Sequence, residues 1–200
     1  MKNSLQILFF LIVSILKGQA VDKLANISFK LENEKEIRIY KGRGISNGGQ
    51  IFRVYQGKDK NWKAELIQWF LPAKKSEDEF EIIPARVTKL TSKTPLELVF
   101  LNIEALDIEY LPKEELFEYK KSKNEVVFDK DENDYFLMSR KMSVLDGKDF
   151  LVKYKSNKKE NEFDYSNPES YLNKYPGIDE YESFIKILKY VEDNFNIQLK

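Results

Sequence analysis

The feature of this sequence that most restricts its fold is an Asn-Gly pair between two alternating apolar runs. Asn47-Gly48 separates residues 37–40 from residues 51–55, and both runs are rich in β-branched and aromatic side chains. Asn-Gly is favoured at the centre of a two-residue hairpin turn because both residues tolerate positive φ. We therefore expect an antiparallel hairpin in which Tyr40 pairs with Tyr55.

A second such pair, Asp146-Gly147, lies between residues 135–144 and 148–155 and predicts a second hairpin. Further runs of strand-like composition extend both hairpins into meanders, and they lie at residues 27–31, 62–71, 80–90 and 162–165. Pro84 interrupts one of these runs, which suits a strand at the edge of a sheet.

Three segments carry helical signals. Thr94, Pro95 and Glu97 form a helix start before an apolar stripe that reaches Leu106, although Leu98–Leu101 is also compatible with a buried strand. Asn167-Pro168 begins a short helix that Pro176-Gly177 ends. The last helix, residues 178–194, carries one apolar stripe of Ile178, Tyr181, Phe184, Leu188, Val191 and Phe195.

These elements predict an α+β fold, in which antiparallel β-meanders pack against two or three helices. Neither an internal repeat nor a linker rich in glycine or proline divides the sequence, so residues 21–200 are expected to form a single domain. The chain contains no cysteine, and its stability must therefore come from the core without disulfides.

The first twenty residues have the form of a secretory signal peptide. Lys2 precedes an apolar run at residues 5–16, and Gly18-Gln19-Ala20 supplies small residues for cleavage before Val21. The run stops at Lys17 and is short for a membrane-spanning helix, which needs about 20 apolar residues. We expect an exported, soluble protein, periplasmic or extracellular, with no transmembrane segment after cleavage. A lipid anchor on a cysteine is excluded, because the chain has none.

Composition narrows the chemistry that this chain can perform. Without histidine or cysteine it has no imidazole base, no thiol nucleophile and no thiolate zinc site, so any catalysis would rest on other side chains such as carboxylates. The 33 basic residues balance 33 acidic ones, and loss of Lys2 and Lys17 with the signal leaves a net charge of −2. This balance gives no reason to expect nucleic acid as a partner.

Two segments resemble a known group of proteins. The C-terminal run Tyr165–Tyr171 with Tyr175–Ile178, and the stretch Ile37–Trp69, are similar to uncharacterised secreted proteins of Bacteroidota. The resemblance implies a location outside the cytoplasm. It implies no activity, because no function is assigned to that group.

Several motifs have a functional and a structural interpretation, and the structural one is favoured in each case. The Gly42–Asn47 loop lacks the third glycine and the following helix of a dinucleotide-binding turn. Residues 129–134 place oxygens as in a calcium loop, but Asp134 and Arg140 stand where that loop needs Gly and Glu. Hence neither a cofactor nor a metal is expected.

Two pairs of side chains are also weak candidates. Trp62 and Trp69 are seven positions apart, so in a strand they point to opposite faces and cannot form one sugar-stacking platform. Glu104 and Asp107 share a helical face near the end of the first helix, which is more often a solvated face than a catalytic pair.

The candidate binding site follows from the use of arginine. The chain has five Arg against 28 Lys, and three of the five lie between residues 38 and 53. Arginine binds carboxylate or phosphate through a planar fork and stacks on aromatic rings. Alternation places most of the candidate residues on one face of the hairpin, beside the glycine loop, where they would form a small anion- or acid-recognising patch. These residues are Arg38, Tyr40, Arg43, Arg53 and Tyr55. The alternative is Arg–Tyr stacking with ion pairs to neighbours such as Glu36.

Together these features predict an exported binding protein whose partner is a protein or another component of the cell envelope. One alternative is a carboxylate-dependent hydrolase of glycan or cell-wall material, because such enzymes need only two carboxylates. A second alternative is an assembly or structural factor of the periplasm. No sequence feature assigns an enzymatic activity.

Overall fold

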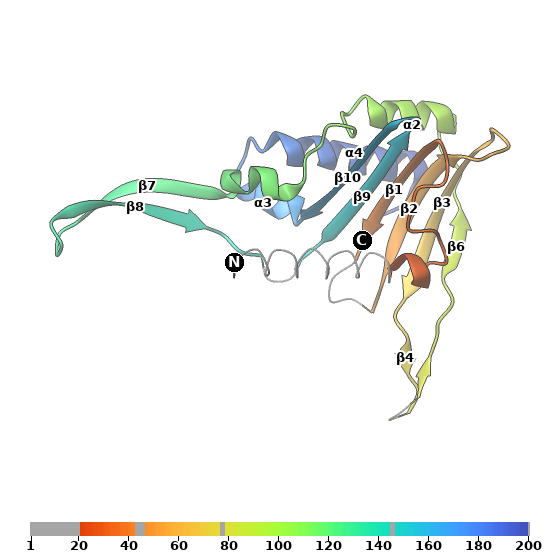
Figure 1. Cartoon of the computed structure of the whole chain (residues 1–200), viewed down its shortest axis with the longest axis horizontal. Coiled ribbons are helices and arrows are strands. Elements are labelled where there is room, and N and C mark those ends of the chain that lie inside the picture. Colours follow the sequence, from red (N-terminus) through yellow and green to blue (C-terminus); the bar gives the residue numbers. More distant parts are fainter. Residues whose placement is uncertain (1–20, 43–46, 77–78, 145–146, 200) are drawn as a thin grey trace.

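Six strands pair side by side into one sheet in which every neighbouring pair is antiparallel. The computed structural model describes residues 21–42, 47–76, 79–144 and 147–199. Across the sheet (Figure 1), the order is β10 (Lys159–Ser166), β9 (Asp149–Ser156), β1 (Lys35–Lys41), β2 (Gly48–Gln56), β3 (Trp62–Phe70) and β6 (Arg86–Lys89). The strand β9 from the second half of the chain therefore lies directly beside β1.

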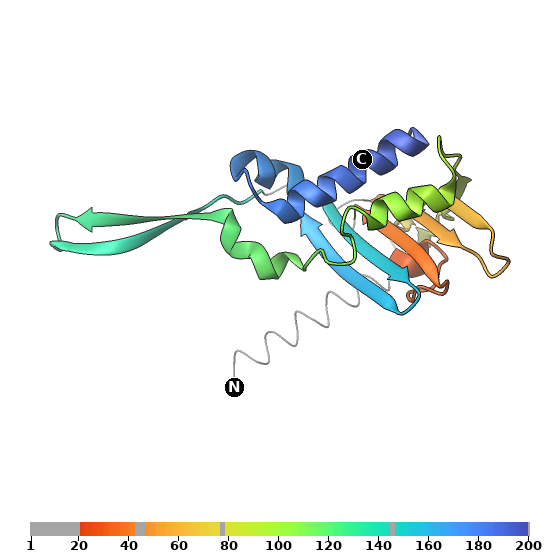
Figure 2. The ribbon, with the colours of Figure 1, turned by 90° about the horizontal axis from the view of Figure 1, so that it is seen from above.

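Two smaller ribbons extend from this sheet. β4 (Ala73–Lys74) and β5 (Phe80–Glu81) pair with each other in the same register as β3 and β6, with Pro72 and Pro84 between the two paired stretches. β7 (Ser122–Asp129) and β8 (Asp134–Lys141) form a separate two-stranded hairpin that projects away from the body of the protein (Figures 1 and 2).

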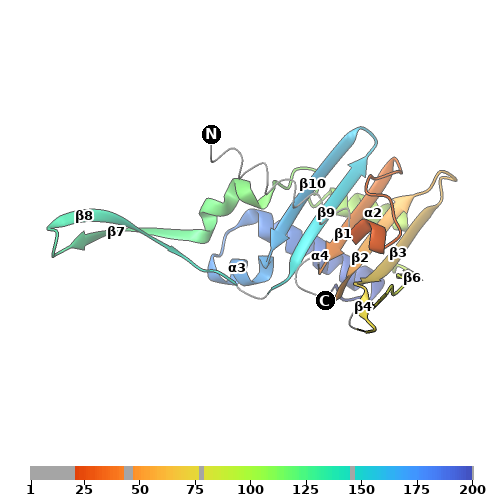
Figure 3. The same ribbon diagram turned by 60° about the horizontal axis from the view of Figure 1, so that its bottom comes forward.

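The helices cover one face of the six-stranded sheet (Figure 2). They are α2 (Leu96–Glu104), the 3-10 helix η1 (Glu114–Lys121), α3 (Pro168–Lys174) and α4 (Asp179–Phe195). Residues 21–24 are helical as well and lie on the opposite face (Figure 3). The predicted α+β class, with antiparallel strands packed against helices in a single domain, is therefore confirmed.

The main core lies between the sheet and these helices. Alternation along β1 and β2 points Ile37, Ile39, Phe52 and Val54 toward the helices, where all four are fully buried. The predicted stripe of the last helix packs there too, and Phe184 makes edge-to-face contacts with aromatic side chains of β9 and β10. Asn196, in the left-handed conformation, ends this helix.

The predicted centre of the first hairpin is wrong. Tyr40 pairs with Ile51 and not with Tyr55, because Gly48 and Gly49 already belong to β2. A Cβ on Gly49 would lie 2.7 Å from the ring of Trp69, so this glycine permits close packing and does not make the turn. The register differs by an even number of residues, and the predicted division of side chains between the two faces is preserved.

The second predicted hairpin is also wrong. Residues 134–141 pair with residues 122–129, which the sequence did not mark as a strand, and the acidic segment between them turns with Asn133 at positive φ. Gly147 instead lies beside the side chain of Asn167, where a Cβ would collide with the amide. Asp146 lies outside the described residues.

Residues Leu98–Leu101, for which the sequence allowed either a helix or a strand, are helical. The predicted cap of this helix is absent, because the Thr94 hydroxyl donates to Asn194 Oδ1 at 3.0 Å instead. Trp62 and Trp69 do point to opposite faces, one against the main core and one into a second cluster. The predicted signal, residues 1–20, lies outside the described residues. Within the described part of the chain, no helix combines the length and apolar character needed to cross a membrane.

Candidate functional site

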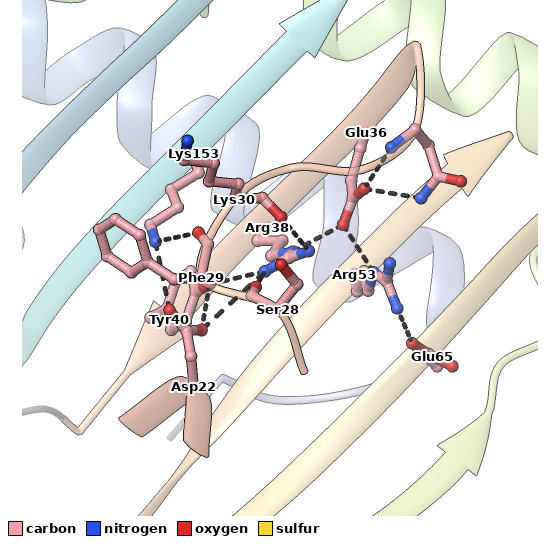
Figure 4. Close-up of polar contacts among 11 residues, drawn as sticks. Asp22, Ser28, Phe29, Lys30, Glu36, Arg38, Tyr40, Arg53, Glu65 and Lys153 are labelled. Atoms are coloured by element: carbon pink, nitrogen blue, oxygen red, sulfur yellow. Dashed lines mark hydrogen bonds and ion pairs between the residues drawn. The ribbon is translucent and has the colours of Figure 1, made fainter. Parts of the chain in front are cut away.

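The face of the sheet opposite the helices is covered in part by residues 21–33, here called the strap (Figures 3 and 4). Val21 and Ala25 of the strap pack against Tyr40, Ile51 and other buried side chains of the sheet. After its helical turn the strap has no regular structure. Its carbonyl groups therefore need partners from the sheet beneath it.

A single row of paired residues crosses all six strands on this face, and every member carries a charge. From β10 to β6 the row is Glu162, Lys153, Arg38, Arg53, Glu65 and Lys89. We call it the charged row. Its second, third and fourth members, Lys153, Arg38 and Arg53, are all cations on neighbouring strands. Such an arrangement is destabilising unless carboxylates neutralise it.

Glu36, on β1, neutralises the middle of the charged row (Figure 4). Its Oε1 accepts from Arg38 Nε at 2.6 Å and from Arg53 Nε at 2.7 Å, and Arg53 Nη1 donates to Glu65 at 2.9 Å. The second oxygen of Glu36 accepts from the Asn33 side chain at 2.7 Å. Because Glu36 and Arg38 are fully buried, these bonds replace the water that each group loses on folding.

Asp22, from the strap, neutralises the other end of the cationic segment. Its carboxylate lies 3.3 Å from Lys153 Nζ and 4.0 Å from Arg38 Nη1, and it accepts from the Tyr40 hydroxyl at 2.7 Å. The same cations bind strap carbonyls: Lys153 donates to Phe29 O at 2.9 Å, and Arg38 donates to the carbonyls of residues 28 and 30. The strap is thus held by charge as well as by apolar contact.

The pKa shifts separate the two buried carboxylates. Burial alone would raise the pKa of Glu36, but the charge of Arg38 and the hydrogen bond from Arg53 outweigh it and lower the pKa. Burial raises the pKa of Asp22, and its bonds to Tyr40 and Lys153 offset this only in part. Burial also lowers the pKa of Lys153, against the charge of Asp22. Burial therefore disfavours the charged form of both Asp22 and Lys153, and their mutual attraction offsets this only in part.

The structure places the predicted patch residues in two different environments. Arg38 and Tyr40 are buried beneath the strap. The Arg53 guanidinium lies 4.0 Å from the centre of the Tyr55 ring and pairs with the buried carboxylate of Glu36. This matches the alternative interpretation, in which the arginine stacks on a tyrosine and forms an ion pair with a neighbour. Arg43 lies outside the described residues. The sequence analysis did not include Asp22 or Lys153 among the site residues. A lysine within the otherwise apolar run Phe150–Tyr154 does indicate a buried cation that needs an acidic partner.

Beyond the strap, the same face is open and forms a groove of about 850 Å³. Strap residues 23–27 form one wall, residues 82–85 form the other, and Ile67 and Val87 lie in the floor. Ile82, Ile83 and Val87 are 75%, 37% and 55% exposed, so large apolar side chains gather here in contact with solvent. Arg53, Tyr55 and Glu65 also line the groove.

Two features that the sequence offered as candidates for metal binding or catalysis can be placed in the described residues. No group of three or more metal-binding side chains comes together among them, and residues 129–134 are a largely exposed turn. Glu104 accepts from the Tyr154 hydroxyl at 2.7 Å, whereas Asp107 is exposed, so the two do not act as a pair. No family model, curated protein or solved structure matches this chain.

Removing the charge of Asp22 tests the role of the strap. We expect Asp22→Asn to lower the free energy of unfolding by about 3–5 kcal/mol, because it leaves Lys153 buried without a counter-charge. The double variant Asp22→Asn/Lys153→Met should recover most of this loss, since it removes both charges. Urea denaturation measures both effects.

The control for this test is the exposed pair Glu34–Lys60, whose side chains are both 72% exposed. Glu34→Gln should change the free energy of unfolding by less than about 1 kcal/mol. A loss in Asp22→Asn no larger than this control would contradict a buried, strap-mediated neutralisation.

The lowered pKa of Glu36 predicts a specific dependence of stability on pH. Its ionised form stabilises the fold above its ordinary pKa of 4.5, and this contribution is lost as the pH falls through the lower folded value. The difference in unfolding free energy between the native chain and Glu36→Gln should therefore be largest near neutral pH and shrink in acid. The raised pKa of Asp22 acts in the opposite direction but is common to both proteins. A difference that does not change with pH would contradict the assignment.

Proposed function

We propose that this chain is an exported binding protein and that the groove beside the strap is its binding surface. The observation that carries the proposal is the exposure of Ile82, Ile83 and Val87 together along an open groove. Exposed apolar patches bordered by polar groups are typical of interaction sites. The groove volume of about 850 Å³ lies within the range of known ligand sites.

The ligand that best fits this site is an extended apolar segment of a partner polypeptide. β6 ends the sheet, and within the described residues no strand pairs with its outer edge. All four residues of β6 are exposed. A strand edge next to an apolar groove can bind the main chain of an extended segment and its apolar side chains at the same time.

Export is supported by the signal-like first twenty residues, with cleavage before Val21. Such cleavage would retain the whole strap, including Val21 and Asp22, which cover the sheet. We expect the protein recovered from the cell envelope or the medium to begin at Val21 by N-terminal sequencing. Recovery of the uncleaved chain from the cytoplasm alone would contradict export.

The hydrolase alternative gains no support from the groove. Among the described residues that line it, Glu65 carries the one carboxylate, and Arg53 neutralises it at 2.9 Å. A glycosidase needs two carboxylates on either side of the scissile bond. Binding is therefore the function that this geometry favours.

A random peptide library displayed on phage tests the groove directly. We expect the purified protein to enrich apolar peptides, and Val87→Asp to weaken their binding at least tenfold by placing a carboxylate on the apolar floor. The matched control is Leu98→Asp on α2, because Leu98 is a similarly exposed apolar residue (46%) outside the groove.

Enriched peptides should bind the Leu98→Asp variant as tightly as the native chain. No enrichment of apolar peptides, or equal binding by the native chain and Val87→Asp, would contradict the groove as the binding surface. The proposal that the chain is exported does not depend on that result, because N-terminal sequencing of the recovered protein tests export separately.

A further inference from the structure

The outer edge of β6 (Figure 1) presents main-chain groups to solvent, and the register of the sheet identifies them. Leu90 N, directly after β6, donates to Ala64 O of β3 at 2.9 Å. In an antiparallel ladder, successive residues alternate between bonding the neighbouring strand and pointing away from it. Thr88 therefore bonds β3 as Leu90 does, whereas the main-chain groups of Val87 and Lys89 point outward.

The opposite edge of the sheet differs, because the chain itself covers part of it. β10 forms that edge, and its Ser166 N donates to Glu114 of η1 at 2.6 Å. The Asn161 side chain donates to the carbonyls of residues 108 and 111 at 2.9 Å. Among the described residues, no hydrogen bond joins the main chain of residues 86–89 to a segment other than β3. The edge at β6 is thus the one left available to a partner.

The side chains of Val87 and Lys89 point to the face of the sheet that holds the groove. Val87 lies in the groove floor opposite Ile67, and Lys89 lies opposite Glu65, which also lines the groove. Side chains of a strand added at this edge alternate in the same way. A partner residue paired with Val87 would extend the apolar floor, and one paired with Lys89 would extend the charged row by one member.

Charge determines which residue suits the position beside Lys89. Arg53 Nη1 donates at 2.9 Å to Glu65, the carboxylate that Lys89 faces across the strands. Lys89, and Lys23 on the strap wall of the groove, are exposed and form no ion pair with any described residue. The unpaired charges at this part of the described surface are therefore positive, and a carboxylate complements them.

We propose that the groove binds an acidic-apolar strand of a partner polypeptide, with the order Asp or Glu, any residue, then Val, Ile or Leu. This inference rests on the proposed function, because it specifies the ligand of the same groove. The strand pairs antiparallel with β6, as do all neighbours in the sheet, so its carboxylate lies beside Lys89 and its apolar side chain beside Val87. The same two partner residues bond the outward main-chain groups of β6.

The peptides that the native chain enriches from the phage library test this order. We expect them to share an acidic residue two positions before an apolar one. A fluorescein-labelled peptide of the enriched sequence should lose about fivefold in affinity when its acidic residue is replaced by Lys, because attraction to Lys89 becomes repulsion. Fluorescence anisotropy measures the dissociation constant.

The reciprocal change is made in the protein. Lys89→Glu should weaken binding of the acidic peptide about fivefold and should bind the Lys-substituted peptide better than the native chain does. The matched control is Lys189→Glu, because Lys189 is an exposed lysine on α4, on the other side of the sheet (Figure 2). This control makes the same change in net charge and should alter the affinity less than twofold.

Enriched apolar peptides that lack the acidic residue, or that carry it after the apolar one, would overturn this inference and leave the groove as the binding surface. A loss in Lys89→Glu that Lys189→Glu matches would also overturn it, because net charge alone would then explain the effect. Failure to enrich any apolar peptide would contradict the groove itself, and this inference with it.

Discussion

Three cations on adjacent strands, Lys153, Arg38 and Arg53, are the constraint on which the rest of this fold depends. A sheet that places like charges side by side needs carboxylates at short range. Glu36 and Glu65 supply two of them from within the sheet, and Asp22 supplies the third from the strap. The segment that precedes the first strand therefore completes the charge balance of the sheet.

This requirement separates the two faces of the sheet. The helices bury one face mainly by apolar packing, as ordinary amphipathic patterns predict. On the other face the strap covers β9, β1 and β2, and the floor near β3 and β6 stays open as the groove. Ile67 belongs to both regions, since it packs in the second cluster and lines the groove. The position of the strap thus determines where a ligand can bind.

Local pattern was enough to predict the fold class, the helices α2, α3 and α4, and the division of the β1 and β2 side chains between the two faces of the sheet. The alternation of Ile37 to Tyr40 identified the two faces of the sheet correctly although the predicted register was wrong. The predicted and observed registers differ by an even number of residues, and such a shift keeps each side chain on its face. Pairing partners were less predictable, since Gly49 serves the packing of Trp69 and residues 134–141 pair locally with an unmarked strand. Asp22 meets Lys153 across 131 positions, and no local pattern carries that contact.

The strap buries Lys153 and Arg38 of the charged row, and selective labelling of lysine amines tests this burial most directly. Lys153 and Lys155 lie on the same face of β9, two residues apart, but Lys153 is 3% exposed beneath the strap, whereas Lys155 is half-buried beyond it and pairs with Glu160. The lowered pKa of Lys153 would make its amine the more reactive of the two if reagent could reach it. Mass spectrometry after brief acetylation should find Lys155 modified and Lys153 protected. Equal or faster modification of Lys153 in the folded protein would contradict the account.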